Sequence, residues 1–578
     1  MSQTGEPGVL DRVESTAVPA PPLYATPEGR ASALRVVMLV PQRIPGWIEV
    51  FLQLAAQNDW IEVVVLSTDA VGSAPAPPFP LSLRALLAVE RWRGKRSGAS
   101  LAPVAVATRR DAVAPIEGSS SAAPDRLRDE IIGLQPDLIL ALGDAVQGQE
   151  LEGLASCAQR GCWLLDGNLT HPVRAGSPLL GPMLRGETAT PVELELHCPP
   201  ASPLLLASSW GRTRHSAFTL QREQAFLKVA PLLLRALHRL AEGGARMPEH
   251  AVATLRMRPP ARPLGMAAGV RALVTTLRAT TRWQWKRRRT RRTWMLVVRR
   301  PGALLDLDAP VIEEATSLCS PMGFWADPCV VEDSGRQLLF VEEWNPHTRK
   351  GEIACLELEG AGVRRLGLVL DEPGHLSFPQ PFQWQGDWYL TVESSEARRV
   401  SLYRATAFPL QWQRVHDLVT NRVCVDPVLH FNEGHWYLFA NVAESGNSTW
   451  DELFLFVSEN LHGPFRPHPC NPIVSDVRRA RLAGRLFSRG GKLIRPAQDC
   501  APGYGAAVVF NEILELDPTH YRERVLSRLG PDWDASLDGC HTYSAAGGTE
   551  VLDAHGIAPA AMTSVRRAGV APASVSPA

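Results

Sequence analysis

The 578-residue chain lacks several features that would place it in a specialised class of protein. Its ten cysteines are scattered, with no C-x-x-C pair, which excludes a zinc ribbon and gives no sign of a disulfide framework. No apolar run reaches the ~18 residues of a membrane span, and the N-terminal MSQTGEPGVLDRVEST has no signal-peptide pattern. The 60 basic and 60 acidic residues balance, so nothing steers the whole chain toward nucleic acid. We therefore expect a cytoplasmic protein.

What is present begins with an α/β pattern in residues 31–245, after a segment, 1–30, that carries no sustained periodicity and is predicted to be disordered. The run LRVVMLV reads as a buried strand, IEVFLQLAAQN as a helix and IEVVVLS as a second buried strand. A further strand is expected at Pro136–Gly143 and an amphipathic helix at Leu220–Glu242. Alternating strands and helices predict a Rossmann-type parallel sheet.

Residues 246–314 are rich in Pro and Arg and are predicted to be a linker. Basic residues concentrate in Arg282–Arg292, interleaved with Trp283, Trp285 and Trp294. We favour a solvated charge run, with peripheral contact to an anionic membrane surface as the alternative. Nucleic-acid binding has little else in the sequence to support it.

Residues 315–555 change to short strands rich in aromatic and β-branched side chains, separated by turns. Four of them begin at Gly335, Gly386, Gly434 and Gly491, a recurrence of about 50 residues that is typical of propeller blades. A fifth, weaker unit is Gly539–Ala554. The pattern predicts an all-β, five-bladed β-propeller. Residues 556–578 are predicted to be a disordered tail.

Acidic residues recur at equivalent edges of these blades: Asp327 in FWADP, Glu393 in LTVES, Asp426 in CVDPV and Asp499 in PAQDC. Carboxylates that converge on a propeller axis supply the acid and the base that acetal chemistry requires. The alternative is that Asp-Pro and Glu-Ser pairs simply end strands. Further candidates for contacts to a sugar are Trp325, Glu343, His375, Gln380, Arg495, Gln498, Asp499 and His541.

The propeller region carries a resemblance in FWADPCVVED, GHLSFPQPFQWQGDWYLTVES, CVDPVLHFNEGHWYLFAN and LIRPAQDCAPGYGAAVVFNEI. These stretches resemble the domain N-terminal to the transferase domain of plant glucosamine inositolphosphorylceramide transferases. The resemblance implies the five-bladed fold, a role in surface-glycan or glycolipid assembly, and kinship with propeller glycosidases. By that kinship Asp327 would be the base or nucleophile, Asp426 the carboxylate that positions the transition state, and Glu393 the general acid. The plant transferase domain has no counterpart here, so the plant reaction is not transferred.

The α/β half resembles the formyltransferase family in GCWLLDGNLTHPVRAGSPLLGPMLRGETATPVELELH, where Asn168 and His171 parallel the family's Asn-x-His pair. Two residues separate them instead of one, and no Asp occurs between Asp166 and Asp306 to serve as the family's downstream carboxylate. Since the catalytic groups of such a site act together, its loss of formyl transfer is expected. The same departures disfavour folate.

The sequence thus predicts a multi-domain chain: an α/β formyltransferase-like domain of Rossmann type, then an all-β five-bladed β-propeller. The leading functional hypothesis is an enzyme, a glycosyl transferase or glycosidase-like protein, acting on a carbohydrate or glycolipid in the propeller. A non-catalytic glycan-binding or scaffold protein is the alternative, and a sugar N-formyltransferase ranks last. A nucleotide sugar is the candidate donor, no metal is assigned, and attachment to the inner face of the membrane stays open.

Overall fold

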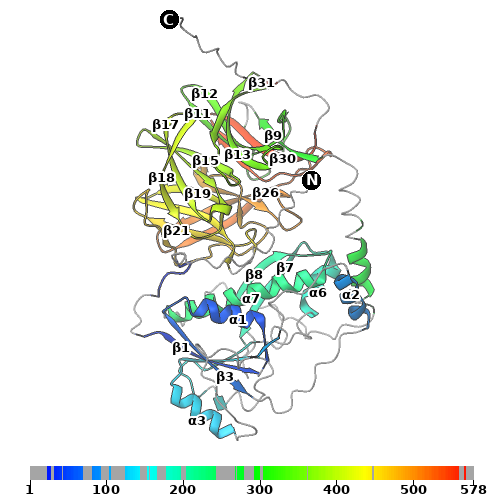
Figure 1. Cartoon of the computed structure of the whole chain (residues 1–578), viewed down its shortest axis with the longest axis vertical. Coiled ribbons are helices and arrows are strands. Elements are labelled where there is room, and N and C mark those ends of the chain that lie inside the picture. The colour runs from blue at the N-terminus through cyan, green and yellow to red at the C-terminus, as the bar shows by residue number, and fades with distance from the viewer. Residues whose placement is uncertain are drawn as a thin grey trace, which may run out of the picture. The chain divides into compact units, whose positions relative to one another are not determined.

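The computed structural model divides the chain into two compact units, shown in Figure 1. The propeller unit comprises Met1–Ala25, Arg289–Ala443 and Ser448–Ala578, and the α/β unit comprises Thr26–Arg288 and Glu444–Asn447. The structure describes residues 22–27, 32–41, 43–68, 81–92, 103–105, 124–142, 153–154, 156–165, 177–196, 204–242, 267, 270–278, 281, 292–299, 304–360, 362–444, 448–558 and 565–567.

The α/β unit contains a four-stranded parallel sheet in the order β3-β1-β5-β6. Its strands are β1 (Leu34–Pro41), β3 (Ile61–Thr68), β5 (Leu138–Leu142) and β6 (Cys162–Leu165). Helices α1 (Gly46–Ala55) and α3 (Pro124–Leu134) lie on opposite faces of this sheet in Figure 1. Buried Val37, Leu39 and Ile139 pack with Ile131 of α3. The predicted parallel α/β sheet is present, while its assignment to the formyltransferase fold stays a prediction.

The remaining elements of this unit include two antiparallel pairs and three helices. They are β2 (Arg43–Pro45) with β4 (Pro103–Ala105), β7 (Ala189–Leu196) with β8 (Leu204–Arg212), α2 (Leu81–Trp92), α6 (Ser177–Arg185) and α7 (Phe218–Ala241). The buried carboxylate of Glu90 in α2 accepts hydrogen bonds from the Phe218 and Thr219 backbone N–H groups. It thereby supplies the α7 N-terminus with the acceptors and negative charge that helix starts need.

The propeller unit contains five sheets, or blades, whose strands are antiparallel except for β31, which pairs in parallel with β14. Their innermost strands follow one another around the ring, because β11 contacts β15 and β29, β15 contacts β19, and β19 contacts β23. Blade one is β11 (Phe324–Asp333), β12 (Arg336–Asn345), β13 (Lys350–Glu359) and β14 (Gly362–Leu370), edged by β31 (Val565–Arg567), and blade two is β15 (Ser377–Trp384), β16 (Asp387–Glu393), β17 (Val400–Ala407) and β18 (Gln411–Val419). Blade three is β19 (Cys424–Asn432), β20 (His435–Val442), β21 (Leu453–Ser458) and β22 (Arg466–Pro467), and blade four is β23 (Arg481–Leu482), β24 (Phe487–Arg489), β25 (Lys492–Asp499), β26 (Ala507–Leu516) and β27 (Tyr521–Leu529). Blade five is β28 (Leu537–Gly539), β29 (Tyr543–Ala546), β30 (Thr549–Ile557), β9 (Arg292–Arg299) and β10 (Thr316–Leu318). The five-bladed prediction is confirmed.

The predicted glycine recurrence corresponds to one kind of turn. In every blade the innermost strand joins the next through two residues that both have positive φ. This is the geometry of a type I′ turn, whose twist matches that of the flanking strands. The five turns are Ser334–Gly335, Gln385–Gly386, Glu433–Gly434, Gly490–Gly491 and Gly547–Gly548. The turn of blade five is therefore at Gly547–Gly548 and not at Gly539, where the sequence pattern started that unit.

Blade five closes the ring, because it joins strands from the two ends of the propeller. β9 pairs with β30 in antiparallel register from Arg299↔Glu550 to Arg292↔Ile557. The sequence analysis included β9 in the linker, whereas the structure makes it a central strand of this sheet. Buried Leu296 and Val298 of β9 pack with Val330 of blade one, so the closing strand also contributes to the core between blades.

Candidate functional site

Every innermost strand of the propeller is interrupted partway along its length. The pairing shifts register between Ala326 and Cys329 in β11 and between Val425 and Val428 in β19, with a corresponding shift in β15. In blades four and five the same strand is split in two, β23/β24 and β28/β29. These five interruptions bring non-ladder backbone and polar side chains together around the axis of the ring.

In blades one to three the interruption is an X-Pro pair with X in the left-handed region. Asp327, Phe378 and Asp426 have φ values of 50°, 50° and 51°. A non-glycine residue in this region costs about 1–2 kcal/mol. Such strain persists where the surrounding structure enforces it, often at functional sites. Of the four acids predicted at equivalent blade edges, Asp327 and Asp426 share this backbone geometry. Glu393 and Asp499 do not, because they end the second strands of their blades, β16 and β25.

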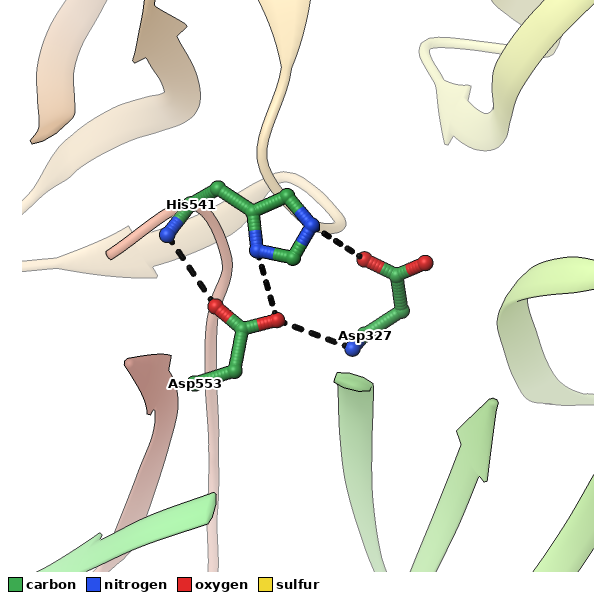
Figure 2. Close-up of side chains that lie close together, drawn as sticks. All are labelled: Asp327, His541 and Asp553. Carbon is green, nitrogen blue, oxygen red and sulfur yellow. Dashed lines mark hydrogen bonds and ion pairs between the residues drawn. The ribbon is translucent and has the colours of Figure 1, made fainter. Parts of the chain in front are cut away.

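The first group of side chains links blade one to blade five, as Figure 2 shows. The His541 ring lies between two carboxylates, with Nδ1 2.7 Å from Asp553 Oδ2 and Nε2 3.3 Å from Asp327 Oδ1. Asp553 Oδ2 also accepts a hydrogen bond from the Asp327 backbone N–H, and Oδ1 accepts one from the His541 N–H. All three side chains are buried. We call Asp327, His541 and Asp553 the axial triad.

Burial and charge compete within the axial triad. Burial raises the pKa of Asp327 well above its usual range, although the neighbouring His541 draws it down. Burial opposes the charged form of His541, but Asp553 and Asp327 outweigh it and raise the imidazole pKa. Burial likewise acts against ionised Asp553, yet His541 and the backbone N–H donors hold the pKa of Asp553 below its ordinary value. Asp553 is therefore the firmly ionised carboxylate of the triad, whereas Asp327 and His541 form a pair that shares a proton.

A second group centres on Arg481 of β23. Its Nε lies 2.7 Å from Asp426 Oδ2, and its Nη2 lies 3.9 Å from Glu393 Oε2. Glu393 Oε2 in turn accepts a hydrogen bond from the Asp426 backbone N–H, and Gln498 Nε2 donates to Asp426 Oδ2 over 3.4 Å. Burial raises the pKa of Asp426 to about 7. The negative charge of Glu393 adds to this increase, and the positive charge of Arg481 offsets only part of it. Asp426 can therefore exchange a proton near neutral pH.

Glu342 of β12 is a further buried carboxyl beside the axial triad. Burial raises its pKa to about 8, and the charges of Glu393 and Asp553 add to the effect. His375 Nε2 lies 3.6 Å from Glu342 Oε1, while His375 Nδ1 accepts a hydrogen bond from the Gly351 backbone N–H. Burial lowers the pKa of His375. At neutral pH, Glu342 is therefore a carboxylic acid facing a neutral imidazole.

Aromatic rings adjoin both groups. Trp294 of β9 stacks on His541 with ring centroids 4.1 Å apart. Tyr504, in the loop after β25, meets the His541 ring edge-on at 5.3 Å and lies under the Arg481 guanidinium at 4.9 Å. Trp450 lies 5.7 Å from Tyr504. Tyr504 is 39% exposed, so part of this residue beside the carboxylates is open to solvent.

Other residues predicted to bind a sugar are engaged inside the sheets. Trp325 is fully buried in the core, and its Nε1–H donates to Glu343, which also pairs with Arg365 at 2.6 Å. Arg495 is fully buried and pairs with Glu523 at 2.7 Å. Asp499 pairs with Arg528 at 2.9 Å, and Gln380 is buried on β15 opposite Thr391. The structure thus brings Asp327, Glu393, Asp426, Gln498 and His541 together, with His375 beside Glu342.

Four residues of the cluster were not singled out as site residues from the sequence: Glu342, Arg481, Tyr504 and Asp553. Arg481 and Tyr504 lie in distinctive stretches, VRRARLAGRLF and DCAPGYG, which offered a weak signal. Asp553 lies in VLDAHG of the weak fifth unit, and only the pairing of β30 reveals its position. Trp294 was grouped with the basic segment.

The predicted residues Asn168 and His171 lie outside the described residues, as do residues 282–291 of the basic segment. Arg292, the last residue of that segment, starts β9, and its Nη1 lies 2.7 Å from Asp538 Oδ2. Among the helices that the structure describes, none combines the length and apolar character needed to cross a membrane.

The axial triad has the residue types of a metal site. Its three residues each offer a ligand atom, and these atoms lie within 4.8 Å of one another. Both imidazole nitrogens of His541, however, already face a carboxylate oxygen, and Asp553 accepts backbone hydrogen bonds on both of its oxygens. A cation would have to displace these contacts. The arrangement fits a shared proton better than a metal ion.

Residues 297–533 match the family described as glucosamine inositolphosphorylceramide transferase 1, N-terminal. The chain is 33% identical over 241 residues to glucosamine inositolphosphorylceramide transferase 1 of Arabidopsis thaliana, covering 40% of this chain and 31% of that protein. It is 34% identical over 208 residues to the protein of the same name from Oryza sativa subsp. japonica, covering 35% and 28%. The chain thus spans about a third of the length of the curated relatives it matches. The matched range contains Asp327, Glu393 and Asp426 but ends before His541 and Asp553.

Solved structures similar to the chain include a family 117 glycoside hydrolase from Zobellia galactanivorans, at 13% identity, with 45% of this chain and 90% of that one covered and a TM-score of 0.30. A GH43_1 enzyme from Xanthomonas citri is similar at 14% identity, with 42% and 91% covered and a TM-score of 0.30. The propeller architecture stands on the strand pairing itself.

Proposed function

We propose that the propeller binds a glycan at the axial cluster and makes or remodels a glycosidic bond there. The similarity of residues 297–533 to the N-terminal region of a sugar transferase supports a carbohydrate or glycolipid as the substrate. A nucleotide sugar is the donor class that we propose for such a transfer. The relative's own reaction belongs to a protein of which this chain matches 31%, and it is not assigned to this chain.

The observation that carries the proposal is a contrast between blades. Phe378 of blade two has the same X-Pro interruption and the same φ of 50° as Asp327 of blade one. An apolar side chain is therefore compatible with this position of the fold. Blades one and three nevertheless place acids there, and both acids are buried, which destabilises a carboxylate unless it is well paired. Residues that cost stability and that the fold does not require are best explained by chemistry.

The chemistry follows from the two kinds of carboxyl in the cluster. Breaking an acetal C–O bond needs an acid to protonate the leaving oxygen and a carboxylate to take the proton of the attacking hydroxyl or to attack directly. Asp327, beside the charged ring of His541, is proposed as the base or nucleophile. Glu393 is the general acid expected from the sequence, and Glu342, which holds a proton at neutral pH, is a second proton donor. Asp426, fixed by Arg481, orients the sugar.

The exposed part of Tyr504 and the nearby Trp294 and Trp450 suit the apolar face of a sugar ring. An observation also favours the alternative, a glycan-binding protein without turnover. Each of the five carboxylates Asp327, Glu342, Glu393, Asp426 and Asp553 is at most 8% exposed. A sugar that rests on these aromatic side chains without reaching the carboxylates would be bound and not converted.

The test measures binding and turnover in one set of samples. The full-length protein is titrated calorimetrically with UDP-N-acetylglucosamine, UDP-glucose and GDP-mannose, and is assayed for release of nucleoside diphosphate and for hydrolysis of p-nitrophenyl glycosides. Asp327→Asn should lower turnover by at least about 100-fold, as loss of an acid–base or nucleophilic group does. The matched control is Asp538→Asn, in β28 of blade five and paired with His555 instead of the cluster.

Binding without turnover in the wild-type protein would establish the glycan-binding alternative. Turnover that survives Asp327→Asn would place the chemistry elsewhere in the chain. The absence of both binding and turnover with all of these sugars would refute the proposed function. A formyltransferase activity, expected to be absent from the α/β unit, would show instead as release of tetrahydrofolate from formyl-tetrahydrofolate that depends on His171.

A further inference from the structure

Asp553 contacts both other members of the axial triad through its two carboxylate oxygens. It is fully buried in β30, and its two carboxylate oxygens engage four groups. Oδ1 accepts from the backbone N–H groups of His541 and Thr542 at 3.0 Å each. Oδ2 accepts from the Asp327 N–H at 2.9 Å and lies 2.7 Å from His541 Nδ1. One side chain therefore fixes both the backbone and the ring of His541, together with the backbone of Asp327.

The contacts determine which nitrogen of His541 carries a proton. Asp553 accepts from three backbone N–H groups and forms an ion pair with Nδ1 over 2.7 Å, which favours a hydrogen on that nitrogen. Nε2 then faces Asp327 Oδ1 at 3.3 Å. With a second proton on Nε2 the ring is an imidazolium between two carboxylates. With that proton on Asp327 instead, the Asp327 O–H donates to the Nε2 lone pair.

Two further contacts favour the charged form of the pair. Trp294 stacks on the His541 ring at 4.1 Å, where an aromatic face stabilises a cation. The Phe378 backbone N–H donates to Asp327 Oδ2 at 3.2 Å, which stabilises a carboxylate there. The geometry thus places the shared proton on His541 and the negative charge on Asp327.

We infer that Asp553 is a positioning residue, which orients His541 so that the imidazolium holds Asp327 ionised for its role as base or nucleophile. The inference rests on the proposed function and adds the residue that controls its key carboxylate. It also explains why an acid lies under the histidine on its far side from Asp327. The charge of Asp553 by itself opposes ionisation of Asp327, so its favourable effect acts through the ring. Without Asp553, burial would favour neutral His541, and the shared proton would pass to Asp327.

Several other charged groups face the triad and bear on its titration. Asp426 of β19 favours the charged imidazole, Glu342 of β12 and Asp426 both oppose ionisation of Asp327, and Arg481 of β23 lies beyond Tyr504. Because these groups remain in place when Asp553 is changed, the contribution of Asp553 can be isolated by a single substitution.

The test is nuclear magnetic resonance on the full-length protein with ¹⁵N-labelled histidine, with the His541 signals identified by their loss in His541→Gln. In the wild-type protein at pH 7 both ring nitrogens should be protonated. In Asp553→Asn, whose single amide oxygen can still accept from the His541 and Thr542 N–H groups but not also from that of Asp327, the His541 titration midpoint should fall by at least about one pH unit. Asp538→Asn, which removes the partner of His555 in the same blade, should leave His541 unchanged.

A neutral His541 ring in the wild-type protein at pH 7 would overturn the inference, and this outcome does not depend on the folding of Asp553→Asn. An unchanged midpoint in folded Asp553→Asn would overturn it as well. The outcome is separable from the proposed function: if the sugars neither bind nor react while His541 titrates as described, the glycan proposal fails and the positioning role of Asp553 stands. In an active protein, Asp553→Asn should shift the pH profile of kcat, whereas loss of a purely structural contact would lower the folded fraction alone.

Discussion

Replacing Glu342 by Gln should make the propeller more stable and remove much of its dependence on pH. Glu342 is 7% exposed, and burial, aided by Glu393 and Asp553, raises its pKa from an ordinary value of 4.5 to about 8. A folded state that holds a proton more tightly than the unfolded state loses stability as pH rises between these two values. The loss begins near pH 4.5, where the unfolded chain ionises, and is complete above about pH 8.

The magnitude follows from that difference. At about 1.4 kcal/mol for each pKa unit, raising the pKa from 4.5 to about 8 costs about 5 kcal/mol of folding free energy once the carboxyl is ionised. A glutamine has no proton to lose, so Glu342→Gln should exceed the wild type by up to about 5 kcal/mol at pH 9. At roughly 2 °C per kcal/mol for a unit of this size, the Tm of the propeller would rise by about 10 °C.

The assay is differential scanning calorimetry of the full-length protein at pH 5, 7 and 9. The two proteins should melt close together at pH 5 and separate progressively toward pH 9. Glu359→Gln, at an exposed position of the same blade, is the matched control and should follow the wild type throughout. Parallel Tm curves for Glu342→Gln and the wild type would refute the reasoning, because Glu342 would then not hold a proton in the folded state.

Two further substitutions test the second group and the turns. Arg481→Met should destabilise the propeller by about 3–5 kcal/mol, most strongly above pH 7, because it leaves the buried carboxylates Asp426 and Glu393 without their cation. Thermal melts check this prediction. The control is the exposed substitution Arg404→Met, which should show no measurable change. Gly434→Ala should cost about 1–2 kcal/mol in chemical denaturation, because φ is 82° and no atom lies within 4 Å of an added Cβ, so the effect is conformational alone. Gly133→Ala in helix α3 should be neutral or stabilising by up to about 1 kcal/mol, and an equal loss at both sites would contradict the turn assignment.

The ring itself was predictable because a propeller repeats its local chemistry. Glycine at positive φ in each type I′ turn leaves a mark in the sequence at Gly335, Gly386, Gly434 and Gly491, and the Asp-Pro pairs at Asp327 and Asp426 mark two of the interrupted strands. Blade five was the weak unit because its strands come from both ends of the propeller. A repeat split in this way does not appear as a contiguous segment, so β9 looked like the end of a linker.

The membership of the site was less predictable, because it depends on the face of a strand and on distant partners. Glu342 and Glu343 are neighbours on β12 and so point to opposite sides. The sequence does not show which one faces the axis; Glu343 was predicted, but it pairs with Arg365, whereas Glu342 lies in the cluster. Arg495 likewise seemed available for a ligand from the sequence. In the structure β25 pairs with β26 and β26 pairs with β27, and Glu523 of β27 forms an ion pair with Arg495.

The dependence of the site on ring closure connects its chemistry with the stability of the fold. The axial triad joins Asp327 at the start of the ring to His541 and Asp553 at its end, and Trp294 reaches the same imidazole from β9. Strand pairing between β9 and β30 is what brings Trp294 and Asp553 into one blade. Within the closed ring His541 lowers the pKa of Asp327, whereas the same carboxyl buried without this partner would hold its proton more tightly. The last blade therefore supplies the charged partner of a buried carboxyl in the first blade, and only the closed propeller brings the two together.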